Sequence, residues 1–244
     1  MKQETLYGIH TITTILNIAP WRVKKIFLLA KQSRLNPIFE LAQAQQIPIE
    51  WCQRHYLDQL ADGNHQGVIA ICQAPKPLDE QALKKIIDDD AKSLLLLVLD
   101  NIVDPHNVGA CLRSADAFAV DAVIVPKHQA CGLTDTVKRV ACGAAETVPF
   151  IQVNNLARVM KDLQAKNIWF YGLDMQGTQS IDQIDFPKRT ALVLGAEGTG
   201  IRHLTAELCD ELMNIPMHGQ VESLNVSVAA GISLFGVRRK IPRE

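Results

Sequence analysis

Polar side chains that could do chemistry follow the apolar run Leu94–Leu99. The segment Asp100–Gly109 is rich in Asp and Asn; its Pro105 favours a turn, and Asn107 can begin a helix. Arg113 follows six residues after Asn107, nearly two helical turns further on. An amide and a guanidinium so placed can bind a ligand by hydrogen bonds, although a helix cap and a surface charge would also explain them.

A glycine-rich segment, Leu194–Gly200, follows a second apolar run. Glycine lets the backbone approach a ligand closely because it has no Cβ. The order here is G-x-x-G-x-G, not the dinucleotide-binding order G-x-G-x-x-G, and no P-loop Gly-Lys-Ser/Thr follows. Glu197 lies among the glycines, where its carboxylate would repel a phosphate and suits a cationic or hydroxyl-bearing ligand. On its own, the segment also fits an ordinary turn.

A third polar segment runs from Ile215 to Ala229 and contains a short strand end, a glycine loop and the start of a helix. We expect Ser223 to be the N-cap of this helix, because a seryl oxygen can accept a hydrogen bond from a first-turn N–H. Asn225 then lies in the first helical turn, where its side chain can face the loop.

The elements that must position these segments are buried strands alternating with helices. Continuous apolar runs predict strands buried on both faces of a sheet at residues 94–99, 122–125, 168–172 and 191–194. Helical spacing predicts helices at 107–118, 156–165 and 224–240. This order predicts an α/β fold with an open, mainly parallel sheet. Ligand sites in such folds lie beyond the carboxyl ends of the strands, which is where the three segments fall.

The first 75 residues alternate on a smaller scale, with expected helices at 9–18 and 36–46 and strands at 23–29, 47–52 and 67–72. Pro75 and Pro77 favour extended backbone and mark a boundary. We therefore predict a small α/β domain over residues 1–75, a linker and helix over 76–93, and a larger domain over 94–244. The helix of the middle segment is expected to end in the acidic run Asp88–Asp90, a solvated face.

The composition is that of a soluble globular protein, with 48% hydrophobic and 21% charged residues. No apolar run approaches the roughly 20 residues that span a bilayer, and the N-terminus lacks a signal-peptide pattern. We expect a cytoplasmic protein with no membrane association. The six cysteines show no zinc-site spacing, so we expect reduced, mostly buried thiols and no metal.

The net charge of −1 does not by itself indicate a nucleic-acid partner. The charge is uneven, however. Residues 1–75 contain seven Lys and Arg against five Asp and Glu, whereas residues 94–244 contain fourteen against sixteen. The front domain is therefore the part better suited to phosphate. Its available basic residues are Arg22, Lys24, Lys25, Lys31, Arg34 and Arg54.

Taken together, the three segments read N-x-x-D-P-x-N-x-G-x-x-x-R, then L-G-x-E-G-x-G, then I-P-M-x-G-x-x-x-S-L-N-V-S. In this order they resemble the three motifs of the SpoU/TrmH branch of the SPOUT RNA 2′-O-methyltransferases, over residues 94–244. The front domain adds to the resemblance. Tyr7-Gly8-Ile9-His10 and His65-Gln66-Gly67-Val68 are similar to the flanks of the RNA-binding domain in bacterial members that methylate a guanosine in the peptidyl-transferase region of 23S rRNA.

The resemblance implies a parallel sheet with a deep trefoil knot, a homodimer, and S-adenosylmethionine bound in the knotted loops against the dimer interface. It implies methylation of a guanosine 2′-oxygen in 23S rRNA by in-line displacement. The backbone around Gly195, Ile215 and Leu224 would hold the cofactor. The implied catalytic and binding side chains are Asn107, Arg113, Glu197, Ser223 and Asn225.

The role of Arg113 in removing the hydroxyl proton stays open. The resemblance assigns this proton to Arg113, yet a charged guanidinium has a pKa above about 12 and no acceptor site. Either Arg113 becomes transiently neutral beside a substrate phosphate, or it fixes the ribose and phosphate and stabilises the developing alkoxide while another group takes the proton.

Three rival functions are compatible with parts of the sequence. The same chemistry could act on a tRNA or on another rRNA site, because the catalytic motifs do not distinguish these targets. A non-catalytic RNA-binding assembly factor could keep the fold, although the intact motif residues argue against it. A nucleotide-dependent oxidoreductase is disfavoured by the glycine order.

Overall fold

The computed structural model describes residues 3–30, 32–61, 63–74, 78–221 and 223–241. The chain divides into two compact units, Met1–Lys76 and Pro77–Glu244, each of which is described by itself below. Lys31 and the boundary prolines, Pro75 and Pro77, lie outside the described residues.

The first unit is a four-stranded sheet in the order β1-β4-β2-β3 with helices on both faces. Its strands are β1 (Gln3–Tyr7), β2 (Val23–Leu29), β3 (Ile49–Cys52) and β4 (Val68–Gln73). Its helices are α1 (Ile9–Ile18), α2 (Asn36–Ala44), α3 (Arg54–Leu60) and the 3₁₀ turns η1 (Pro20–Arg22) and η2 (Ser33–Leu35). Helices α1 and α2 share the larger apolar core, and α3 packs through Leu57 on the other face.

The elements predicted in the first unit are confirmed to within two residues at each end. Strand β1 and helix α3 were not predicted from the sequence. Each of them buries one side chain, Leu6 in β1 and Leu57 in α3, so neither shows the apolar periodicity that marks the other elements.

The second unit is a seven-stranded sheet in the order β7-β6-β5-β10-β8-β11-β9, in which every strand pair is parallel. The predicted parallel α/β sheet is therefore confirmed. The strands are β5 (Leu94–Leu99), β6 (Ala122–Pro126), β7 (Phe150–Val153), β8 (Trp169–Leu173), β9 (Gln179–Ser180), β10 (Arg189–Leu194) and β11 (Glu211–Asn214). The trefoil knot stays a prediction.

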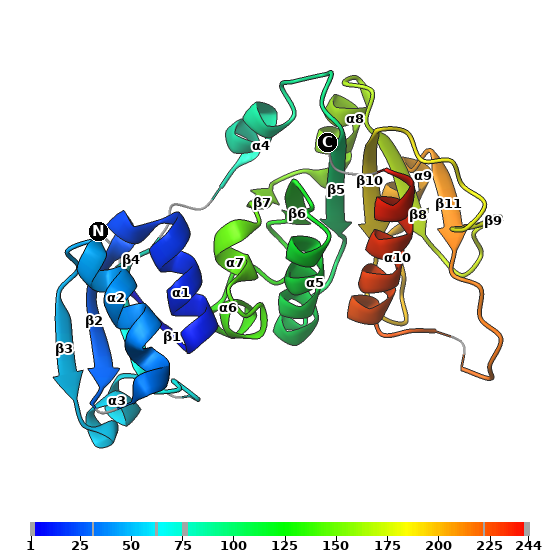
Figure 1. The fold of residues 1–244 in the computed structure, drawn as a ribbon. Helices are drawn as coiled ribbons and strands as arrows, with labels where there is room; N and C mark the ends of the chain where they lie inside the picture. The colour runs from blue at the N-terminus through cyan, green and yellow to red at the C-terminus, as the bar shows by residue number, and fades with distance from the viewer. Residues whose placement is uncertain (1–2, 31, 62, 75–77, 222, 242–244) are drawn as a thin grey trace. The chain divides into compact units, whose positions relative to one another are not determined.

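Helices cover both faces of this sheet, so every side chain of β5 and β10 is buried. Leu95, Leu97 and Leu99 point into one core with α5, α6 and α10, and the alternate leucines of β5 point into the other with α4 and α8. Helices α5 and α10 contact each other on one face (Figure 1). The helices are α4 (Glu80–Ile86), α5 (Pro105–Ala117), α6 (Asp135–Val140), α7 (Ala144–Thr147), α8 (Leu156–Gln164), α9 (His203–Glu207) and α10 (Val226–Lys240).

Two helix starts differ from the expectation. Helix α5 begins at Pro105 rather than at Asn107, because the side chain of Asp104 caps it by accepting a hydrogen bond from the backbone N–H of His106. Helix α10 begins at Val226, and its N-cap is Asn225 rather than Ser223. Asp104 and Asn225 are residue types that cap helices as well as the expected Asn107 and Ser223 do. Intrinsic capping preference therefore does not predict which residue of each pair begins the helix.

The segment expected to contain a linker and a helix packs within the second unit. Leu78 forms a bridge with Ile151 of β7, and Leu83 of α4 lies in the core. Helix α4 ends at Ile86, so the acidic run Asp88–Asp90 follows the helix instead of ending it. Elements β7, β9, α6, α7 and α9 of this unit were not expected.

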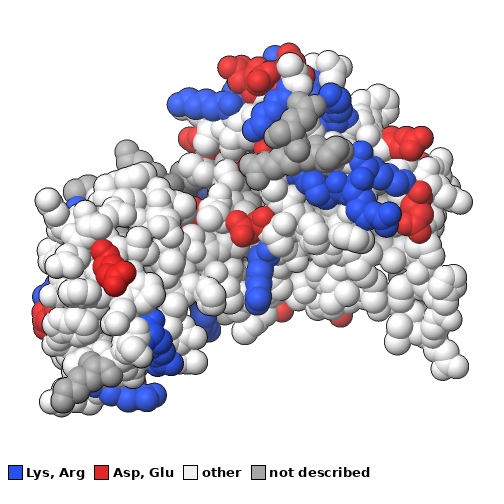
Figure 2. Space-filling model, in the orientation of Figure 1, with Lys and Arg blue, Asp and Glu red and all other residues white. Residues whose placement is uncertain are grey.

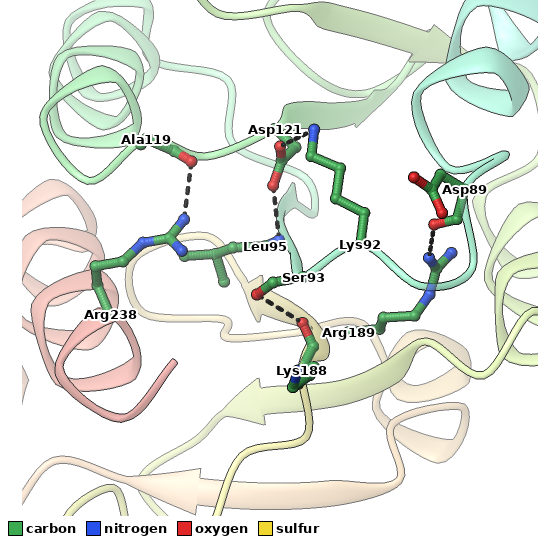
Figure 3. Close-up of polar contacts among 9 residues, drawn as sticks. All are labelled: Asp89, Lys92, Ser93, Leu95, Ala119, Asp121, Lys188, Arg189 and Arg238. Carbon is green, nitrogen blue, oxygen red and sulfur yellow. Dashed lines mark hydrogen bonds and ion pairs between the residues drawn. The ribbon is translucent and has the colours of Figure 1, made fainter. Parts of the chain in front are cut away.

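The amino edge of this sheet is held by polar contacts at the end away from the three polar segments (Figure 3). Asp121 accepts a hydrogen bond from the backbone N–H of Leu95 (2.9 Å), and Arg238 donates to the carbonyl of Ala119 (2.8 Å). Arg238 belongs to the basic last turn of α10, where Figure 2 shows Lys and Arg side chains gathered. Arg238, one of these basic residues, therefore stabilises the packing of α10 against the segment that follows α5.

All six cysteines are free thiols, but the expectation that most are buried is wrong. Cys72 and Cys111 are buried, three others are partly buried, and Cys142 is exposed. Burial raises the pKa of the Cys111 thiol to about 12, so it stays protonated at neutral pH. No helix in the described residues has the length and hydropathy needed to cross a membrane.

Candidate active site

A cavity of about 630 Å³ opens at the carboxyl edge of the second unit's sheet. Its walls come from the loops that follow β8, β10 and β11 and from the start of α10. Because all the strands are parallel, these loops emerge at the same edge, as expected for a ligand site in such a sheet. The lining includes Leu173, Asp174, Gly195, Glu197, Ile215, Ser223, Leu224 and Val226.

The loop after β10 is a tight turn built on glycine. A bridge joins Ala196 to Gly200, whose N–H donates to the carbonyl of Ala196 (2.8 Å). A Cβ on Gly195 would lie 1.9 Å from the carbonyl carbon of Gly200, so no other residue fits there without moving the backbone. Gly198 and Gly200 have φ values of 82° and 68°, which favour glycine. The turn thereby presents Glu197, which is exposed, at the cavity wall.

Asn225 joins this turn to the start of α5. Its Nδ2 donates to Asn107 Oδ1 (3.0 Å) and lies 3.4 Å from Glu197 Oε2. Its Oδ1 accepts hydrogen bonds from the N–H (2.9 Å) and the hydroxyl (2.6 Å) of Ser227, which fixes its orientation. Three of the five expected side chains, separated by up to 118 residues in the chain, therefore meet in one cluster.

Arg202 and Asp100 hold the base of the glycine turn, and sequence reasoning did not single out this pair. The Asp100 carboxylate is fully buried and accepts from Arg202 through Nε (2.8 Å), Nη2 (2.5 Å) and the backbone N–H (3.1 Å). Arg202 also donates to Gln129 Oε1 (3.2 Å). A buried carboxylate is costly without a charged partner, so this pair fixes the residue that follows β5 to the segment that follows the glycine turn.

Ser223, Ile215 and Leu224 all line the cavity, as does the backbone at Gly195. The cavity is also lined by three residues that were not predicted from the sequence, Asp174, Met175 and Gln176. They follow β8, a strand that the sequence did predict. The rule that sites lie beyond strand carboxyl ends could therefore have found them.

Arg113 lies apart from the cluster in this chain. It is exposed, and its Nη1 lies 4.0 Å from the sulfur of Cys142. Six residues of α-helix separate Arg113 from Asn107, which is a rotation of about 240° and a rise of about 9 Å. Arg113 and Asn107 therefore project from different sides of α5.

The cavity suits a small organic ligand that carries positive charge. Its volume is in the range of roughly 300–1,000 Å³ that is usual for small-molecule sites. Leu173, Leu224 and Val226 provide apolar walls, the glycine turn offers close backbone contact, and Asp174 and Glu197 contribute carboxylates. The cluster of amides and a carboxylate beside it can orient hydroxyl groups by hydrogen bonds.

Comparison with known families gives two matches that together cover most of the chain. Residues 94–235 match the model of the SpoU rRNA Methylase family. Residues 5–78 match the model described as RNA 2′-O ribose methyltransferase substrate binding.

Relatives with assigned functions match over nearly the whole chain. The 23S rRNA (guanosine-2′-O-)-methyltransferase RlmB of Escherichia coli strain K12 is 48% identical over 97% of this chain and 98% of its own length. The enzyme of the same name from Coxiella burnetii is 45% identical over 98% of this chain and 96% of its own length. A crystal structure of the SpoU methyltransferase AviRb from Streptomyces viridochromogenes, in complex with AdoMet, superposes with a TM-score of 0.80 at 25% identity, covering 98% of this chain and 90% of that one.

Proposed function

The chain belongs to the SpoU rRNA methylase family, and we propose that it transfers a methyl group from S-adenosylmethionine to the ribose 2′-hydroxyl of a guanosine in 23S rRNA. The observation that carries this proposal is the 48% identity to relatives with that activity over both units of the chain. A relative that shared only the catalytic unit would leave the RNA target open. We place the target in the peptidyl-transferase region and the enzyme in the cytoplasm, as the sequence resemblance implies.

The cavity fits the cofactor, which AviRb holds in its crystal structure. S-Adenosylmethionine, when bound, supplies a methyl group carried on a positively charged sulfonium. The backbone around Gly195, Ile215 and Leu224 would hold its adenine and ribose against the apolar walls. The carboxylates of Asp174 and Glu197 offset its positive charge, because both line the same cavity.

The Asn225 cluster positions the acceptor ribose. Asn225 uses its amide N–H groups on Asn107 and Glu197, so both partners are held by a side chain that is itself fixed by Ser227. Asn107 accepts from Asn225 at Oδ1, so its amide N–H groups would be available as donors to ribose hydroxyls, and the second carboxylate oxygen of Glu197 would be available as an acceptor. Ser223 adds a hydroxyl at the cavity wall. Such alignment can account for much of the rate, since effective molarities of about 10⁵ M or more are reached by well-oriented groups.

The position of Arg113 supports a site shared between two chains. Within one chain Arg113 and Asn107 project from different sides of α5, so the guanidinium does not join the Asn225 cluster. In a homodimer, the partner's Arg113 can complete each site. There it would fix the phosphate and ribose of the RNA and stabilise the developing alkoxide. This role needs the charged guanidinium and no loss of its proton.

The outer face of α10 is the surface that we assign to dimerisation. Val226 and Leu234, on the inner face of α10, are 5% and 0% exposed and belong to the core. Val228, Ile232 and Phe235 are 49%, 39% and 52% exposed and lie along one face of the same helix. A row of exposed apolar side chains at this spacing suits helix packing against a second copy.

The first unit is the RNA-binding part, in keeping with the family model that it matches. A chain beginning near residue 76 should still bind S-adenosylmethionine but should lose most methylation of 23S rRNA, and a high RNA concentration should partly restore it. If the shortened chain methylates the same nucleotide as efficiently as the full chain, the first unit does not select the target.

The direct test is methyl transfer with the purified full chain, radiolabelled S-adenosylmethionine, and in vitro transcripts of 23S rRNA or tRNA. A ribose 2′-O-methyl group blocks alkaline cleavage at that nucleotide, so the label should be recovered in an alkali-resistant dinucleotide from 23S rRNA. Label in tRNA would favour the alternative substrate. No cofactor consumption with either RNA would favour a non-catalytic assembly factor.

A further inference from the structure

The basic residues of the first unit are not equally available to RNA. Arg22 donates to Glu4 and to the carbonyl of Gln73 (3.1 Å), and its side chain is 13% exposed. Lys25 is paired with Glu50. Both cations are therefore used within the unit, contrary to the sequence expectation that they are available. We therefore expect phosphate binding at basic residues without a carboxylate partner.

The other end of the same sheet has a different arrangement. The carboxyl ends of β1 and β2 meet the start of β4 there, because Gly8 N–H donates to the carbonyl of Val68 (3.4 Å) and Leu29 N–H to that of Gly67 (2.9 Å). Turn η2 follows β2 at this end and contains Arg34. The two sequence motifs around Gly8 and Gly67 are thereby brought together.

Arg34 is exposed at this end and is held by neutral oxygens. Its Nε donates to Gln32 Oε1 (3.0 Å) and its Nη2 donates to the carbonyl of Gln66 (3.1 Å). Among the described residues no carboxylate pairs with it, so its positive charge is not compensated locally. The two hydrogen bonds fix the plane of the guanidinium and leave other N–H groups for a ligand. A fixed guanidinium loses little entropy when it binds an anion.

Gln66 is held in a conformation that a residue with a side chain rarely adopts. Its φ is 54°, and its Oε1 accepts from the N–H of Ile9 (2.8 Å). The neighbouring His65 is 4% exposed, accepts from Gly67 N–H at Nδ1 (3.0 Å) and contacts Asp58 Oδ1 through Nε2 (2.9 Å). A left-handed conformation is strained for a residue other than glycine and persists where the surroundings enforce it, often at a functional site. In this conformation the backbone carbonyl of Gln66 accepts the hydrogen bond from Arg34.

We propose that Arg34, with the side chains of Gln32 and Gln66, forms an RNA-contacting site at this end of the first unit. Arg34 binds a backbone phosphate of the rRNA, and the two amide side chains bind ribose hydroxyls or base edges next to it. The inference rests on the proposed function for its RNA partner. It assigns the contact to one end of the sheet and excludes the end that carries Arg22 and Lys25.

RNA suits this site better than a simple anion does. A phosphate alone can accept hydrogen bonds from the guanidinium and from the amide N–H groups but has no donor for the amide oxygens, whereas a nucleotide offers a phosphate together with donors and acceptors on its ribose and base. The amide groups can act as both donor and acceptor, which matches the 2′-hydroxyl and the base edges of an unpaired loop.

The test compares Arg34→Gln with Lys24→Gln in the full chain. Lys24 is exposed on β2 in the same unit, near the other end of the sheet, so both variants lose one positive charge from the surface. The probe is an unmodified in vitro transcript of 23S rRNA, and its Kd is measured at several salt concentrations. We expect Arg34→Gln to raise the Kd about tenfold, the loss of a charge-assisted hydrogen bond. It should also reduce the slope of log K against log salt by about 0.7–0.9, the value for one phosphate contact.

Lys24→Gln should leave both quantities near the wild-type values, and Arg34→Lys should keep the salt slope because it keeps the charge. Neither S-adenosylmethionine affinity nor Tm should change with Arg34→Gln. A lower Tm with an unchanged salt slope would mean that Arg34 only holds the loop, and it would overturn the inference. So would equal effects of Arg34→Gln and Lys24→Gln. If the wild-type chain binds the transcript but does not methylate it, the proposed function fails, while the comparison of RNA affinities still decides this inference.

Discussion

Replacing Gly195 with alanine should disrupt the cofactor cavity through a backbone clash of known size. The added Cβ would lie 1.9 Å from Gly200 C, 2.1 Å from Gly200 O and 2.1 Å from Ile201 N. Ordinary carbon contacts are about 3.5 Å or longer, so the backbone of Gly200 must retreat by about 1.5 Å. All three atoms belong to the main chain, so no side-chain rotation relieves the clash. The movement displaces the turn that presents Glu197.

The expected result of Gly195→Ala is a loss of S-adenosylmethionine affinity of at least about 100-fold, since a shift of about 1 Å in a site can cost that factor. Overpacking of this kind should also lower the free energy of unfolding by about 1–3 kcal/mol. Isothermal titration calorimetry and urea unfolding measure the two effects. Gly219→Ala is the matched control, because its added Cβ would meet no atom within 4 Å. Cofactor affinity within threefold of wild type in Gly195→Ala would refute the reasoning.

Three further experiments, with four substitutions, test the shared site, the dimer and the Asp100–Arg202 pair. A heterodimer of an Arg113→Ala chain and an Asn225→Ala chain should recover about half of the wild-type activity, because one shared site is then intact; two inactive homodimers and an inactive heterodimer would mean that each site uses one chain. Phe235→Glu on the outer face of α10 should shift sedimentation from dimer to monomer and abolish methyl transfer; an active monomer would contradict the dimer requirement. Asp100→Asn should lower the free energy of unfolding by roughly 3 kcal/mol, since Arg202 then lacks its carboxylate, and it should weaken cofactor binding. Unchanged urea unfolding would show that the pair does not lock the turn.

The strands of the second unit were predictable because they are buried on both faces. Strands β5 and β6 are runs of apolar residues with no exposed position, and β10 is apolar from Ala191 to Leu194; such runs are visible without any tertiary information. Strand β7 has only four residues, which is too short for a periodic signal. The N-cap of α10 illustrates a second limit. Ser223 and Asn225 are equally good caps by type, and the choice depends on contacts of Asn225 with Ser227 and with distant Asn107.

The candidate site was predictable as a set of loops but not as a set of contacts. The motifs placed Asn107, Glu197 and Asn225 after strand ends, and their meeting follows from the parallel sheet. The Asp100–Arg202 pair spans 102 residues, and nothing local marks its members as partners. The pairing of Arg22 with Glu4 likewise depends on β1, the strand that the sequence analysis missed. Long-range ion pairs of this kind appear only when the fold brings their residues together.

The most direct test of the central claim is a map of 2′-O-methyl groups in total RNA from cells with and without this protein. The account predicts that one guanosine of 23S rRNA, in the peptidyl-transferase region, loses its methyl group in the deletion strain and regains it when the wild-type chain is restored. An Asn225→Ala chain should not restore it. An unchanged 23S rRNA map, or the loss of a methyl group from tRNA instead, would contradict the account.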